Sequence, residues 1–282
     1  MPEFDTPEPI SAAIELALGD VRIIASDRAT TVVEVRPTDS SASLDVTTAE
    51  QVRVTCSRGN LRIKGPKGWA PFNKVGSVDV VVELPAGSQV RAESAAVGFR
   101  SEGDLGECRF KTATGDLQLD RTDALSLSTA AGDVVVEHVA GRAEINTHSG
   151  SVRLTEVGGS ASIKNSNGAT WVGRIAGDLR VVAANGHVSV DAAEASLEVK
   201  NANGNIRVGE VVRGTASLVT AMGDVEVGVR EGTSAWLDAR SSFGRLDNSL
   251  TAADGPAAPD EKVELRVRTS FGDIAVRRSG AA

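Results

Sequence analysis

The sequence predicts an all-β protein, a parallel β-solenoid of coils about eighteen residues long with a β-rich N-terminal cap. Two patterns support this prediction: glycines recur at a nearly constant spacing, and apolar residues alternate with polar ones on both sides of each glycine. The composition agrees, since 41% of the residues are hydrophobic but only 3% are aromatic, with no Tyr. Val, Leu, Ile and Ala must therefore fill the interior, which suits thin layers of stacked sheet.

Residues 1–97 are expected to form the cap, because they have strand patterns without the short period. Capping is needed because an open solenoid exposes a sheet edge that invites aggregation. Residues 98–282 are expected to form the solenoid repeats, continuous with the cap in one structural unit. The strands predicted in the cap are residues 14–18, 21–25, 31–35, 52–56, 61–64 and 77–84.

The repeat is anchored on one glycine per coil. Two and four residues after it, and five and seven residues before it, the side chains are mostly apolar and share one parity, as in strands with one buried face. We expect all four columns to be buried. The spacings are 17, 18, 18, 18, 18, 19, 21 and 28 residues between Gly115, Gly132, Gly150, Gly168, Gly186, Gly204, Gly223, Gly244 and Gly272.

A column of short polar residues lies three positions before each glycine. We expect it to be an internal seam that hydrogen-bonds between coils, as asparagine ladders do in other stacked-strand structures. Glycine and its frequent successor Asp supply turn chemistry at this corner. The column is Thr112, Thr129, Thr147, Asn165, Ala183, Asn201, Thr220, Ser241 and Thr269.

The C-terminal end has two features of its own. Residues 254–260 are rich in Pro and Ala and are expected to form an insertion loop that lengthens the last repeat. The final strand ends in Arg277-Arg278, charges that we expect to discourage pairing between the ends of two molecules.

Two motifs carry a family resemblance that covers most of the chain. The strand Val80-Val81-Val82-Glu83-Leu84 closes in Pro85-Ala86-Gly87-Ser88, and stretches of the form Thr-x-x-Gly-Asp-Val recur, as at residues 129–134. With these motifs the chain resembles the putative-adhesin family of bacterial β-strand-repeat proteins, a domain of unknown function. The resemblance implies a β-solenoid and a binding role at the cell surface, but no chemistry.

No pattern typical of an active site is found. Cys56 and Cys108 lack metal-ligand spacing and are interpreted as two small buried residues, and the histidines His138, His148 and His187 sit without a completing ligand. Outward carboxylates on the strands are diluted by neutral residues, so we expect no enzyme, cofactor or metal. The formal charge of −8 argues against nucleic-acid binding.

The start of the chain lacks the pattern of a signal peptide, and no stretch approaches the roughly 18 apolar residues of a membrane span. A cytoplasmic protein is therefore expected, although the resemblance implies that the cell surface is the alternative location.

Candidate partner-binding residues lie on the outward side of the strands. Four positions before the glycines runs a stripe with five bases and no acid, from which Lys164, Lys200, Arg240 and Arg268 are selected. Trp171 is expected to point outward, where its ring could stack on a sugar or an Arg, or else be covered by Arg153 and Ser189. Trp69 and Trp236 are weaker candidates of the same kind.

The predicted function is a non-catalytic β-solenoid scaffold or binding protein with an unknown protein or glycan partner. One alternative is a self-assembling cytoskeletal-type solenoid, which requires apolar, uncharged ends. A second is a carbohydrate-active enzyme, which requires clustered acids in a cleft.

Overall fold

The computed structural model describes residues 2–66, 74–250 and 261–280. The chain forms two compact units, Met1–Ala140 and Gly141–Ala282. The predicted fold class is confirmed, since the described residues form a nearly all-β structure in which strands stack in parallel. The division expected at residue 97 concerns where the short repeat begins, and it stays a prediction.

The first unit begins with a mixture of parallel and antiparallel pairs. β1, β3 and β6 pair antiparallel in that order, as do β4 and β5, whereas β2 runs parallel to β5, β6 and β7. The elements are β1 (Glu3–Asp5), β2 (Ser11–Ser26), β3 (Thr30–Pro37), α1 (Ser43–Gln51), β4 (Arg53–Ser57), β5 (Asn60–Lys64), β6 (Val78–Pro85), β7 (Gln89–Glu102), β8 (Asp104–Thr114), β9 (Leu117–Ala131) and β10 (Val134–Val139).

Residues 14–18 and 21–25, predicted as two strands, belong to the single strand β2. Gly19 lies in its middle at φ +136°, and a Cβ there would come within 1.8 Å of the Val78 carbonyl oxygen. β2 then stacks on β7 in register from Ser11 to Ile24. β2 therefore stacks in the same way as the strands of the later coils, although its sequence lacks their glycine spacing.

The helix α1 was not predicted. Its polar side chains hold the chain before β6, because Thr48 accepts a hydrogen bond from Gly76 N at 2.8 Å and Asp45 accepts one from Ser77 N at 2.9 Å. Few apolar residues mark its buried side, so its sequence has little of the period that identifies helices.

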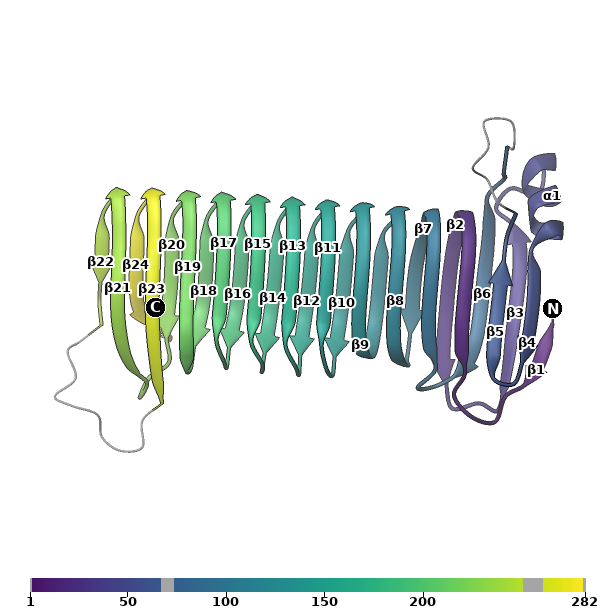
Figure 1. Ribbon diagram of the computed structural model, residues 1–282, viewed down its shortest axis with the longest axis horizontal. Coiled ribbons are helices and arrows are strands. Elements are labelled where there is room, and N and C mark those ends of the chain that lie inside the picture. The colour runs from purple at the N-terminus through teal and green to yellow at the C-terminus, as the bar shows by residue number, and fades with distance from the viewer. Residues whose placement is uncertain (1, 67–73, 251–260, 281–282) are drawn as a thin grey trace. The chain divides into compact units, whose positions relative to one another are not determined.

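The second unit consists of two stacks of parallel strands, visible as two rows in Figure 1. The pre-glycine stack is, in spatial order, β11 (Ala143–Ser149), β13 (Ala161–Asn167), β15 (Leu179–Asn185), β17 (Leu197–Asn203), β19 (Gly214–Met222), β23 (Lys262–Phe271) and β21 (Ser234–Phe243). The post-glycine stack is β12 (Val152–Val157), β14 (Thr170–Ile175), β16 (Val188–Ala193), β18 (Ile206–Val211), β20 (Val225–Val229), β24 (Ile274–Arg278) and β22 (Leu246–Asn248).

The core is formed by the four predicted columns. Ile145, Ile163, Val152 and Val188 are fully buried, and the register read from the sequence is confirmed for these coils. The exception is the coil of β21 and β22. There Leu246 is 51% exposed, because among the described residues this coil is paired on one side only.

The coils do not stack in chain order. The last coil of the chain, β23 and β24, lies between the coil of β19 and β20 and the coil of β21 and β22. Arg277 forms an ion pair with Glu226, and Arg278 donates to the carbonyls of Arg230 at 3.0 Å and Thr233 at 2.8 Å. The expectation that these arginines protect the end of the solenoid is wrong. Residues 254–260, predicted to be an insertion loop, lie outside the described residues.

The polar seam is internal and hydrogen-bonded between coils, as predicted, and its partners are backbone carbonyls instead of other side chains. Thr220 donates to Gly204 O at 3.1 Å and Thr269 to Gly223 O at 2.9 Å, so the seam caps glycine carbonyls of the neighbouring coil. A side-chain ladder occurs instead on the exposed side of the corner. There Asn203 donates to Asn185 and Asn185 to Asn167, each at 2.9 Å.

Candidate functional site

The predicted basic residues form one column on the outer face of the pre-glycine stack. All four are exposed, and strand register places them in a row across six neighbouring strands. In spatial order the row is Lys164, Val182, Lys200, Val219, Arg268 and Arg240. We call these residues the basic column. Because parallel strands lie about 4.8 Å apart, Lys164 and Lys200 are roughly 10 Å apart along the stack.

Carboxylates beside the column form ion pairs with three of its four cations. Lys200 pairs with Glu198 at 2.5 Å, and Asp238 pairs with Arg268 at 3.0 Å and with Arg240 at 3.4 Å. These pairs are solvent-exposed, and exposed ion pairs contribute little free energy. The cations therefore remain available to an external anion.

A shallow groove of about 530 Å³ borders the basic column on the same stack. Hydroxyls from Ser160, Ser162, Ser196 and Ser217 line it, together with an ion pair of 2.9 Å between Arg180 and Glu198. Hydroxyls and a charged pair can hydrogen-bond to a polar chain laid across the strands. This groove could not be predicted from the sequence, because its lining residues occupy turn and strand positions without a constant residue type.

Trp171 lies on β14 in the post-glycine stack, so it does not join the basic column in one site. The Arg153 guanidinium carbon is 4.1 Å from the centroid of the indole ring, and Nε1 donates to Asp191 at 3.2 Å. Ser189 is its neighbour in register on β16. The ring is half-buried, with one face already occupied by a cation.

Trp236 is 58% exposed on β21. Trp69 lies outside the described residues.

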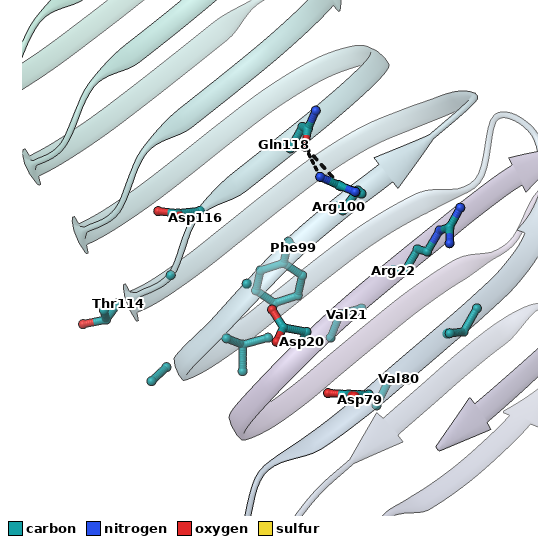
Figure 2. Close-up of a pocket in the computed structure, with 15 residues that line it drawn as sticks. Asp20, Val21, Arg22, Asp79, Val80, Phe99, Arg100, Thr114, Asp116 and Gln118 are labelled. Carbon is teal, nitrogen blue, oxygen red and sulfur yellow. Dashed lines mark hydrogen bonds between the residues drawn. The ribbon is translucent and has the colours of Figure 1, made fainter. Parts of the chain in front are cut away.

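The first unit has a groove of about 550 Å³ that sequence reasoning missed (Figure 2). Asp20 on β2 lies in register with Asp79 on β6 and with Gly98 on β7, and Arg22 lies in register with Arg100. Figure 2 shows the two arginines along one side of the groove and the aspartates along the other. The sequence could not reveal it, because Asp20 and Gly98 meet only through the pairing of β2 with β7.

The electrostatics of this groove centre on Asp20. Burial raises the pKa of its carboxyl, and the neighbouring Asp79 carboxylate raises it further. Gly98 makes room for the side chain, because a Cβ at that position would lie 2.4 Å from Asp20 Oδ1. On the other side, Arg100 donates to Gln118 at 2.7 Å and Arg22 pairs with Glu102 at 2.8 Å.

The titratable groups elsewhere show no arrangement for metal chemistry within the described part of the chain. No group of three or more His, Cys, Asp or Glu side chains there could hold a metal ion. Cys108 is buried, and desolvation raises the pKa of its thiol to about 11. Cys56 is only half-buried, so the expectation of two buried cysteines is wrong for that residue.

The stacked strands and their shallow surface grooves define a β-solenoid repeat protein. The chain belongs to the Toastrack DUF4097 family, whose model matches residues 11–277. This confirms the resemblance found in the sequence. No curated protein matches the chain.

Several solved structures are similar to the chain. A putative adhesin from Bacteroides fragilis has 10% identity and a TM-score of 0.46, over 98% of this chain and 95% of its own. A putative adhesin from Parabacteroides distasonis has 14% identity and a TM-score of 0.38, over 97% of this chain and 95% of its own. A putative lipid binding protein from Parabacteroides distasonis has 10% identity and a TM-score of 0.30, over 98% of this chain and 95% of its own.

No helix within residues 2–66, 74–250 and 261–280 has the length and apolar character of a membrane span.

Proposed function

We propose that this protein is a non-catalytic β-solenoid that binds an elongated, acidic partner across the outer face of the pre-glycine stack. The observation that carries the proposal is the basic column, in which Lys164, Lys200, Arg268 and Arg240 lie in register on a rigid sheet. Cations held in one row on a rigid sheet complement an extended chain that carries several carboxylates.

The neighbouring groove extends this surface with hydroxyls that can hydrogen-bond to the partner between its charges. A carboxylate-bearing glycan and an acidic protein segment share the chemistry that the column would recognise. Adhesin-like architecture is compatible with either of them. Trp171, on the opposite stack, is the proposed anchor of a separate contact.

Two model polymers test the proposal, polygalacturonate for a glycan and poly-L-glutamate for a protein, with dextran as the neutral control. Binding is measured by titration calorimetry at low and at physiological salt. Replacing Lys164 and Lys200 together by Ser should weaken binding of the preferred polymer by about tenfold at low salt, because two exposed cations are lost.

The matched control removes two cations from the post-glycine stack, Arg174→Ser with Arg207→Ser, and should leave the affinity unchanged. Equal losses in both double variants would show that net charge alone drives binding and would overturn the proposal. Absence of binding to either polymer at low salt would also overturn it.

The cytoplasm is the proposed location, and the cell surface is the alternative. The free thiols of Cys56 and Cys108 are compatible with a reducing compartment. Fractionation of the native cells followed by antibody detection distinguishes the two, and it also indicates which of the two polymers is the relevant model.

A further inference from the structure

The coil of β21 and β22 leaves an open edge at the end of the second unit. Within the described residues, β21 pairs only with β23 and β22 only with β24, each on one side. Leu237 and Ala239, which occupy columns that are buried in the inner coils, are half-exposed here. The interior of the solenoid therefore reaches the surface at this coil.

Large apolar side chains gather around the same edge. Trp236 is 58% and Phe243 68% exposed, and Phe243 stacks on Phe271 with ring centroids 4.9 Å apart. Soluble proteins usually protect an edge strand with Lys, Pro or a bulge. The ten residues of β21 include no Lys and no Pro, and their pairing with β23 stays in register.

The backbone of β21 shows which groups face the open side. Ser234 N donates to Glu261 O at 2.8 Å, so the even-numbered residues from 234 to 240 direct their N–H and C=O groups towards β23. Ala235, Leu237 and Ala239 consequently turn their backbone groups to the open side.

The charges on β21 are self-complementary about Ala239. Asp238 and Arg240 flank this residue with side chains on the outer face. In an antiparallel pair of two β21 strands with a two-fold axis at Ala239, Asp238 of one copy stands opposite Arg240 of the other, twice. Ala239 then faces its own counterpart with its free backbone groups, as the hydrogen-bonded positions of an antiparallel ladder require.

We propose that the occupant of this edge is a second copy of the chain, and that two molecules pair through antiparallel β21 strands about Ala239. The pairing covers Leu237 and Ala239 of both copies and brings Trp236 of each towards Phe243 of the other. Arg240 belongs to both this edge and the basic column, so the two proposals are separated by their tests: the acidic partner is tested at Lys164 and Lys200, away from the edge.

The test uses the full chain and measures mass by sedimentation equilibrium and by light scattering after size exclusion. The wild type should show twice the 29.1 kDa of the chain. Asp238→Arg and Arg240→Asp should each weaken self-association by about tenfold or more, because like charges then face each other twice.

Two further measurements make the result specific to this pairing. The double variant Asp238→Arg with Arg240→Asp restores the complementarity and should dimerise again. An equimolar mixture of the two single variants should form a heterodimer, since one strand then carries only cations and the other only anions at these positions. Thermal unfolding of each variant verifies that it is folded.

A monomeric wild type at tens of micromolar would overturn the proposal and leave residues 251–260 of the same chain, or another protein, as the occupant of the edge. A dimer that persists in both single variants, or a mixture that fails to associate, would equally overturn it.

Discussion

Asn165 donates its side-chain amide to the carbonyl oxygen of Gly150 in the preceding coil, at 3.1 Å. The same nitrogen lies 3.1 Å from the carbonyl of Gly168 in its own coil. Two coils further on, Asn201 repeats the arrangement with Gly186 at 2.9 Å and Gly204 at 3.1 Å. Each Asn thus serves two glycine carbonyls. In the coil between them Ala183 interrupts the polar seam, and the carbonyls of Gly168 and Gly186 there already have these side-chain donors.

Replacing Asn165 by Ala should destabilise the protein by about 1–3 kcal/mol, because two partly buried carbonyls lose a side-chain donor. Asn167→Ala is the matched control. It removes the same side chain from the exposed ladder, where water can substitute, and should change the free energy of unfolding by less than about 0.5 kcal/mol. Urea denaturation measures both. Equal losses in the two variants would contradict the structural role assigned to the seam.

The buried columns and the seam could be predicted from the sequence because they repeat locally. Ile163 and Val188 alternate with polar neighbours at a fixed distance from a glycine, and this pattern alone determines the side they face. The order in which the coils stack in space could not be predicted in this way. Arg278 is near the end of the chain yet lies inside the stack, because the chain passes one coil position and returns, and no local pattern records that return.

The candidate site was predictable only in part for a related reason. Lys164 and Lys200 occupy the same repeat position, so their alignment followed from the period. Asp20 and Gly98 belong to segments without that period, and the groove between their strands depends on a pairing of distant residues. Strand alternation predicts that Trp171 lies on the outer face, but which charged neighbour covers the ring depends on side-chain packing.

Ile163→Ala should cost about 2–5 kcal/mol, because the side chain is fully buried and the stacked coils leave a cavity that cannot collapse easily. Leu246→Ala is the control in the coil of β21 and β22. Its side chain is 51% exposed in the monomer, so a much smaller loss is expected. Both substitutions are made in a monomeric background such as Asp238→Arg, and denaturation measures the free energy of unfolding. A loss for Leu246→Ala as large as that for Ile163→Ala would show that the Leu246 side chain is buried and contradict an open edge at this coil.

Asp20→Asn should raise the melting temperature at pH 7, with the gain shrinking as the pH falls towards 4. Burial and Asp79 raise the pKa of Asp20, so the folded state favours its protonated form. The stability that this protonation contributes is present below the unfolded pKa of 3.8 and is lost as the pH rises through the higher folded value. Most of the side chain is exposed, so the effect is small.

Asp39→Asn is the control, and it should lower the melting temperature at pH 7 instead of raising it. Hydrogen bonds from the Ser41 hydroxyl and backbone lower the pKa of the Asp39 carboxyl, so its ionised form favours folding. Scanning calorimetry across pH 3–7 follows both variants. A drop in melting temperature at pH 7 for Asp20→Asn would show that its charge is favourably paired.

The fluorescence of Trp171 can be measured alone in the double variant Trp69→Phe with Trp236→Phe, which retains Trp171 as its single tryptophan. Arg153 covers one face of the ring, so adding Arg153→Ala should shift the emission to the red and increase quenching by acrylamide. Lys164→Ala, a cation on the opposite stack, should change neither. If Trp171 anchors a partner, titration with cell extract or cell-envelope glycans should also shift its emission. An emission spectrum that stays constant at saturating ligand would remove Trp171 from the proposed binding residues and leave it as a packed side chain.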